Sequence, residues 1–160
     1  MEDGLHAALA TGMLTLLSTT LMPAADALAL GITTAIIANA LIDGIGTEKE
    51  NDNYYTTPAT HTLPRAAFLG AAAGAAGALL AILLTHSAPW PIILAAILGG
   101  TLTGLLHLAL DTLTGDAIYV KRNGEWKKII LVKRKIQNLR GAIILASLVM
   151  LMLAFKIISL

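Results

Sequence analysis

The chain has 160 residues, the length of one ordinary domain, and 56% of them are hydrophobic while only 13% are charged. Soluble domains carry roughly 25% charged residues, so this chain has too few to cover a water-exposed surface. The mean hydropathy of +0.76 also excludes a disordered chain. The net charge of +1 gives no indication of a specific nucleic-acid partner, and without cysteine there is neither a disulfide nor a thiolate metal site. The composition predicts an integral membrane protein.

Five apolar stretches come close to the roughly 20 residues that a helix needs to cross the bilayer core. Pro23 separates the first two, and a short segment around Trp90 separates the third from the fourth, so each pair is expected to form an antiparallel hairpin. The first stretch could instead be a cleaved signal peptide, but Glu2 and Asp3 stand where such a peptide is positively charged, which favours a retained helix. The predicted fold is all-α, a single polytopic transmembrane bundle over residues 1–160. Its five spans are expected at residues 5–22, 24–42, 66–84, 92–110 and 141–158.

The basic residues indicate how the chain is oriented. Eight of the 11 Lys and Arg residues lie between the fourth and fifth stretches. Because basic loops remain in the cytoplasm, this loop, the 43–65 segment and the N-terminus are expected inside a cell membrane, and the C-terminus outside. The eight residues are Lys121, Arg122, Lys127, Lys128, Lys133, Arg134, Lys135 and Arg140.

Two polar segments separate the predicted spans. Residues 46–60 are polar and rich in turn formers, which is typical of a loop or flap. Within the basic segment 115–140, residues 117–132 predict a cytoplasmic β-hairpin with Asn123 and Gly124 as its tight turn. Its alternating Lys and aromatic residues could contact anionic lipid head groups, or the segment could be a solvated loop that only fixes topology.

Small residues recur in the third and fourth stretches. Such residues let helix backbones approach closely in lipid. We therefore expect close packing within one bundle rather than a dimer motif. The residues are Gly70, Gly74, Gly77, Gly100 and Gly104.

Ionisable residues in membrane spans are costly, and by default they mark function. The predicted topology brings three His and two Asp from four spans to the inner end of the bundle. His107 and Asp111 are four residues apart and share one helix face, as do Asn39 and Asp43. His86, at the outer end of the third span, is the exception. The five clustered residues are His6, Asp43, His61, His107 and Asp111.

This cluster favours a divalent metal site. A structural ion pair between Asp43 and Arg65 is the simpler alternative, but three imidazoles and two carboxylates exceed what one ion pair requires. His107 and Asp111 can present an imidazole and a carboxylate side by side, a donor set that suits Zn, with Mn or Fe as alternatives. A metal ion there would lower the pKa of bound water and polarise a phosphoryl or carbonyl oxygen.

Roles can be assigned to the residues around such an ion. His61, His107 and Asp111 are expected as ligands, while His6 and Asp43 complete the shell or one of them acts as the base. Arg65 is placed to hold an anionic group such as a phosphodiester. Support of the ligands by neighbouring hydroxyl groups is expected from Thr62 and Thr114.

The segments that carry these residues resemble a known family. They are His6, then Asn39-Ala-Leu-Ile-Asp43, then Thr57-Pro-Ala-Thr-His61-Thr-Leu-Pro-Arg65, then His107-Leu-Ala-Leu-Asp111-Thr-Leu-Thr114. This order is similar to that of the membrane-bound metal-dependent hydrolases of the YdjM-like family, nearest to an archaeal branch of unknown function. It is more distantly similar to the helical zinc-dependent phospholipases C.

The resemblance implies that His6, Asp43, His61, His107 and Asp111 are metal ligands and that the chain hydrolyses an ester. The broader family often has a second Asp and a His just after the first Asp, whereas this chain has Gly44-Ile45-Gly46 there. Fewer ligands argue against a centre with several metals.

The predicted function is therefore a membrane-bound metal-dependent hydrolase acting on a phospholipid or another ester near the cytoplasmic face. The first alternative is a non-enzymatic membrane protein whose cluster binds a metal or only ties helices together. The second is a small transporter. A transport pathway needs polar groups through the whole depth of the membrane, but the third and fourth spans are apolar outward of Thr103. The oligomeric state is not indicated by the sequence.

Overall fold

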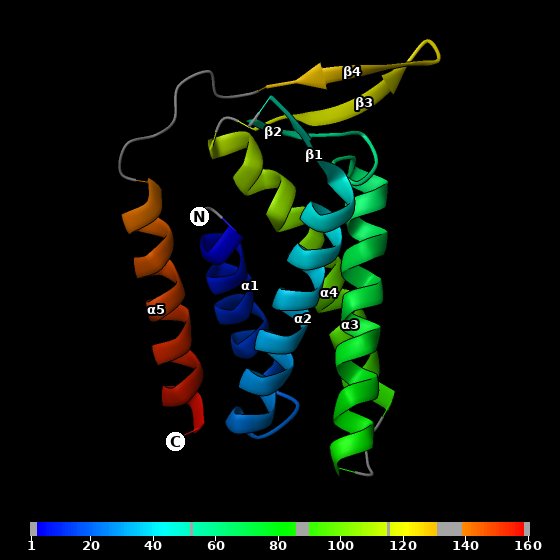
Figure 1. Cartoon of the computed structure of the whole chain (residues 1–160). Helices are drawn as coiled ribbons and strands as arrows, with labels where there is room; N and C mark the ends of the chain where they lie inside the picture. The colour runs from blue at the N-terminus through cyan, green and yellow to red at the C-terminus, as the bar shows by residue number, and fades with distance from the viewer. Residues whose placement is uncertain (1–2, 52, 86–89, 115, 131–138, 159–160) are drawn as a thin grey trace.

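The computed structural model describes residues 3–51, 53–85, 90–114, 116–130 and 139–158. Within these ranges the chain forms five helices and two small β-hairpins (Figure 1). The helices are α1 (Asp3–Ser18), α2 (Ala24–Gly46), α3 (Leu63–Thr85), α4 (Trp90–Thr114) and α5 (Leu139–Ile158). The strands are β1 (Thr47–Glu50), β2 (Asn53–Thr56), β3 (Ile118–Arg122) and β4 (Glu125–Ile129).

Three of the helices are long and apolar enough to cross a membrane. The qualifying segments are Ala24–Gly46, Leu63–Leu83 and Trp90–Leu113, with mean hydropathies of 1.8, 2.1 and 2.0. Helix α1 has 16 residues and ends at Ser18 rather than at residue 22, so at 1.5 Å per residue it is about 24 Å long, short of the roughly 30 Å core. The helical bundle is thus confirmed, while crossings by α1 and α5 stay predictions.

Helices α3 and α4 pack backbone to backbone through their small residues. A Cβ atom built on Gly74 would lie 2.0 Å from the carbonyl oxygen of Ala96, and one on Gly104 would lie 2.0 Å from that of Ala66. Only glycine fits at such a separation, and close approach of this kind is how helices associate without a hydrophobic driving force. The expected packing of small residues within one bundle is confirmed.

Helix α1 packs against α2, α4 and α5, so it lies between α5 and the rest of the bundle (Figure 1). Leu9 of α1 joins Leu110 of α4 and Ile143 of α5 in one buried apolar cluster. A second cluster combines Ile42 of α2 with Ala66 and Leu108, beside the polar residues at the same end of the bundle. The two clusters together therefore join all five helices near that end of the bundle.

Both hairpins lie at the end of the bundle where α2 ends and α3 begins (Figure 1). The β3–β4 hairpin is confirmed: Asn123 and Gly124 have φ of 54° and 85°, the left-handed pair that a tight type I′ turn requires. Residues 46–60 are not simply a loop, because β1 and β2 form a second antiparallel hairpin there. Asn51, with φ of 48°, turns this chain, and the Tyr and Thr residues of β2 favour a strand.

Some residues singled out in the sequence lie outside the described part of the chain. These are His86 and Lys133-Arg134-Lys135, together with the side chains of Thr114, Arg140 and Lys156.

Helix α1 begins at the same end as the hairpins, whereas α5 ends at the opposite end (Figure 1).

Replacing Gly74 with Val is expected to force α3 and α4 apart, because the added carbon atoms would collide with the Ala96 carbonyl. Overpacking costs about 1–3 kcal/mol or more, so the melting temperature of the detergent-solubilised protein should fall. Ala75→Val is the matched control, since Ala75 is exposed on the same helix. Equal melting temperatures for the two variants would contradict this packing.

Candidate functional site

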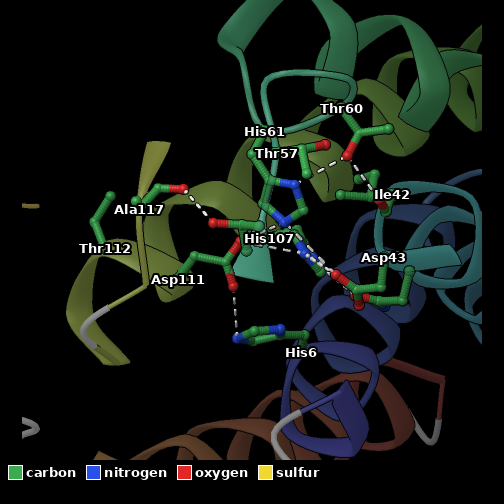
Figure 2. Close-up of polar contacts among 12 residues, drawn as sticks. His6, Ile42, Asp43, Thr57, Thr60, His61, His107, Asp111, Thr112 and Ala117 are labelled. Atoms are coloured by element: carbon green, nitrogen blue, oxygen red, sulfur yellow. Dashed lines mark hydrogen bonds and ion pairs between the residues drawn. The ribbon is translucent and has the colours of Figure 1, made fainter. Parts of the chain in front are cut away.

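Five ionisable side chains from four parts of the chain meet at the hairpin end of the bundle (Figure 2). His6 comes from α1, Asp43 from the last turn of α2, and His61 from the segment between β2 and α3. His107 and Asp111 come from the last two turns of α4, one turn apart on the same face. All five predicted metal ligands are therefore brought together.

Four of these side chains place two imidazole nitrogens against two carboxylate oxygens. His107 Nε2 lies 3.1 Å from Asp43 Oδ1 and 3.3 Å from Asp111 Oδ2. His61 Nε2 lies 3.7 Å from the same Asp43 oxygen and 3.5 Å from the same Asp111 oxygen. Nitrogen and oxygen atoms thus alternate around one small volume.

The hydrogen bond to Asn39 determines which nitrogen of His107 is protonated. Asn39 Nδ2 donates to the carbonyl oxygen of Ala35 at 2.7 Å, which leaves Asn39 Oδ1 as an acceptor. His107 Nδ1 is bonded to this oxygen and must therefore donate a proton to it. In the neutral ring, Nε2 then carries a lone pair that points at the two carboxylates.

Thr60 fixes His61 in the same way. Its hydroxyl group donates to the carbonyl oxygen of Ile42 at 2.7 Å, and its oxygen lies 2.9 Å from His61 Nδ1. A hydroxyl has one proton to donate, so His61 Nδ1–H is the donor to Thr60. His61 Nε2 is buried and makes no hydrogen bond within the described structure, and its lone pair also faces Asp43 and Asp111.

The Nε2 lone pairs of the two imidazoles repel the two carboxylates that they face. A cation between them, or protonation of the rings, removes this repulsion. A metal-bound histidine characteristically donates its other ring N–H to a protein acceptor, which is the arrangement of both His61 and His107. The residues present therefore fit a divalent cation by the chemistry of their donors.

The nitrogen–oxygen spacing is compatible with such an ion. Zinc bonds of about 2.0–2.1 Å in a tetrahedron separate neighbouring ligand atoms by about 3.3–3.4 Å, and the four nitrogen–oxygen separations of 3.1, 3.3, 3.5 and 3.7 Å bracket this value. The ligand atoms of Asp43, His61 and His107 all lie within 4.8 Å of one another, so these three residues form one set that could hold a metal ion.

His6 lies beside this group of four. Its Nε2 is 3.7 Å from Asp111 Oδ1, the carboxylate oxygen that does not face His61 and His107. Its ring also meets the edge of the His107 ring, with 4.7 Å between centroids. His6, His107 and Asp111 form a second set that could hold a metal ion. His107 belongs to both sets. Because its Nδ1 is bonded to Asn39, only its Nε2 is left to bind an ion, so the two sets compete for this one nitrogen.

Asp43 is the one member of the group of four that reaches solvent. Its side chain is 29% exposed, compared with 0% for His61, 1% for His107 and 5% for Asp111. Within this group, solvent therefore contacts mainly Asp43, in the last turn of α2.

Arg65 stands apart from the cluster. Its Nη1 donates to the carbonyl oxygens of Pro58 at 2.6 Å and Ala59 at 3.4 Å, and its guanidinium group lies over the ring of Trp126. In the described part of the chain, Asp43 pairs with the two histidines and not with Arg65. The alternative of a structural Asp43–Arg65 ion pair is therefore wrong.

The residues that orient the ligands are not the expected ones. Thr62 is buried, but its hydroxyl group makes no hydrogen bond in the described structure, whereas Asn39 and Thr60 bond the two imidazoles directly. The sequence carried a signal for each, because Asn39 is one turn from Asp43 and Thr60 precedes His61. It did not show which imidazole each would meet.

The β3–β4 hairpin holds the segment that carries His61. The backbone N–H of Tyr119 donates to the carbonyl oxygen of His61 at 2.8 Å. The Tyr119 hydroxyl donates to the carbonyl oxygen of Thr56 at 2.6 Å, and the Thr56 hydroxyl donates to that of Ala117 at 3.2 Å. The hairpin therefore helps to position one side of the cluster.

A family model described as a protein of unknown function (DUF1286) matches residues 1–110. The chain belongs to this family. The matched region contains His6, Asp43, His61 and His107, and it ends one residue before Asp111. No curated protein and no solved structure matches the chain. A functional assignment therefore depends on the geometry of the cluster.

Thr60→Val removes the hydroxyl group that holds His61 Nδ1 while it keeps most of the side-chain volume. Loss of such an outer hydrogen bond typically lowers metal affinity about 10–100-fold, and chelator competition with zinc should show this change. Thr62→Val is the matched control, because the neighbouring buried hydroxyl bonds nothing in the described structure. If the two variants bind zinc equally, Thr60 does not orient a ligand.

Gly46→Ala is expected to displace His61, because a Cβ atom there would lie 1.6 Å from Thr60 Oγ1 and 2.7 Å from His61 Nδ1. Metal bound per chain, measured by elemental analysis, should fall while the protein remains folded. Gly44→Ala adds the same methyl group two residues earlier, where nothing lies within 4 Å, and should bind metal like the wild type. Normal metal content in Gly46→Ala would exclude this placement of His61.

Proposed function

We propose that the chain is a membrane-bound metal-dependent hydrolase that cleaves a phosphate or other ester at the cytoplasmic face of the membrane. The observation that carries this proposal is the pair of Nε2 atoms of His61 and His107, each set by an Nδ1 hydrogen bond to face two carboxylates. The resemblance of the His and Asp segments to YdjM-like hydrolases supports it.

His61, His107 and Asp111 would hold the ion, which we take to be zinc, with Mn or Fe as alternatives for the same nitrogen and oxygen donors. Three protein ligands leave a fourth position open, and an ion held in this way polarises an ester oxygen and lowers the pKa of water. Asp43, the carboxylate of the cluster that reaches solvent, would then act as the base and accept the proton of an attacking water. His6 lies against the outer oxygen of Asp111 and would hold that carboxylate in place.

The proposal includes an orientation in the membrane. The basic residues of β3 and β4 favour a cytoplasmic hairpin. Both hairpins lie at the end of the bundle where α2 ends (Figure 1), and Asp43 of the cluster belongs to the last turn of α2. The site would then lie at the level of the inner head groups, with α1 beginning inside and α5 ending outside. A membrane-embedded ester would reach it laterally.

Burial favours one alternative, a structural cluster without catalysis. Among the described residues, His6, His61, His107 and Asp111 are almost completely removed from solvent, as expected for polar groups that only join helices. The exposure of Asp43 favours the metal-dependent hydrolase instead, because a purely structural cluster does not need a carboxylate that solvent can reach. Metal content and hydrolysis decide between the two.

Asp111→Asn and His107→Ala are expected to lose bound metal and to reduce hydrolysis to background, because each removes one of the three proposed ligands. The measurements are elemental analysis of protein purified without chelator, and cleavage of a chromogenic phosphodiester and a carboxylic ester in detergent micelles. Asp26→Asn, an exposed carboxylate in the first turn of α2, is the control and should match the wild type.

Equal metal in wild type and in Asp111→Asn would exclude the metal site. Metal that is lost in the variant, without cleavage of either ester by the wild type, would leave the structural alternative.

A further inference from the structure

An open groove runs beside the metal cluster, between the end of α2 and the beginning of α3. Its volume is about 290 Å³, and its lining is mostly apolar. Ile45 and Phe68 contribute side chains that are 56% and 71% exposed. The lining residues are Ile45, Ala59, Thr60, Pro64, Arg65, Phe68 and Leu69.

One residue of the groove wall, Arg65, shares an aromatic ring with a second cation. The Arg65 guanidinium carbon lies 5.3 Å from the centre of the Trp126 ring, and Lys121 Nζ lies 5.6 Å from it. Lys121 and Trp126 are directly opposite each other in the β3–β4 ladder, so both side chains leave the same face of the hairpin. Within the described residues, neither cation forms an ion pair with a carboxylate.

An apolar groove with one cation in its wall and a second cation over the same aromatic ring, neither with an acidic partner in the described residues, suits an anionic amphiphile. We propose that it binds one molecule of an anionic phospholipid, with an acyl chain in the groove and the phosphate at Arg65 and Lys121. A tryptophan beside the phosphate is typical of the head-group level of a membrane. The depth of the groove in the membrane agrees with this level, because it lies where the candidate spans α2 and α3 end and begin.

The same lipid is the substrate class we assign to the metal cluster, and in this respect the inference rests on the proposed function. Ile45 in the groove wall is two residues after Asp43, the carboxylate of the cluster that reaches solvent. Thr60, also in the wall, bonds the imidazole of His61 at 2.9 Å. A lipid in the groove would thus lie next to the one exposed edge of the metal site.

The chain supplies its own reporter for this site. It has two tryptophans, and Trp90 begins α4 at the end of the bundle away from the hairpins (Figure 1). A Trp90→Phe background leaves Trp126 as the single emitter. Quenching of its fluorescence would be measured in detergent micelles that contain brominated phosphatidylglycerol or brominated phosphatidylcholine.

Phosphatidylglycerol is expected to quench Trp126 at a lower mole fraction than phosphatidylcholine. Because a basic residue near a lipid surface changes affinity about fivefold, Arg65→Gln and Lys121→Gln should each reduce the preference by about that factor. Lys127→Gln is the matched control: it removes the same charge beside Trp126, but Lys127 pairs with Val120 on the other hairpin face, and the preference should be kept. Ala59→Leu, which fills the groove, should weaken quenching by both lipids.

Equal quenching by the two lipids would overturn the proposal. An equal loss of the phosphatidylglycerol preference in Lys127→Gln and Arg65→Gln would also overturn it, because that result would indicate a general attraction of anionic lipid to the basic hairpin. Glycerol phosphate at the same concentration should not compete, and competition by it would show a site for free phosphate instead.

The measurement is repeated in Asp111→Asn so that binding is separated from hydrolysis. The lipid preference is expected to survive in this variant, because Asp111 touches neither the groove nor Trp126. Survival of the preference together with a wild type that cleaves no ester would refute the proposed function and leave the lipid site. Cleavage without any lipid preference would refute the lipid site alone.

Discussion

The structure depends on one electrostatic constraint at the hairpin end of the bundle. His61 and His107 each commit Nδ1 to a protein acceptor, so both direct Nε2 at the carboxylates of Asp43 and Asp111. Burying two carboxylates beside two lone pairs is unfavourable without a positive charge. A divalent cation supplies that charge while both imidazoles stay neutral. Protonation of the two imidazoles would supply it without a metal ion. The preset tautomers favour the cation, because they prepare both nitrogens as ligands.

The rest of the fold brings these groups within reach of one another. Glycines let α3 and α4 meet backbone to backbone, which holds the start of α3 against the end of α4. Gly46 has the same effect at the end of α2, where a side chain would collide with Thr60 and His61. Gly46, three residues after Asp43, is therefore needed for close packing. The β3–β4 hairpin completes the arrangement through the hydrogen bond from Tyr119 to the His61 carbonyl.

Much of the fold could be predicted, because apolar length and turn chemistry are local properties. The helix-forming stretches and the Asn123-Gly124 turn follow directly from residue order. Residues 46–60 were harder, since a short polar strand pair has no apolar alternation to reveal it. The end of α1 at Ser18 was not predicted either, because Leu21 and Met22 extend the apolar stretch beyond the two threonines that follow Ser18.

Residue order alone predicts a helical membrane protein in which three His and two Asp residues come together at one end of the bundle. It also determined that His107 and Asp111 are neighbours, since a helix brings residues four apart onto one face. Only the tertiary structure decided that Asn39 and Thr60 orient the imidazoles, that Asp43 alone among the four reaches solvent, and that Arg65 lies over Trp126. The physical reason is that helical periodicity fixes neighbours within an element, whereas partners on different elements depend on how those elements pack.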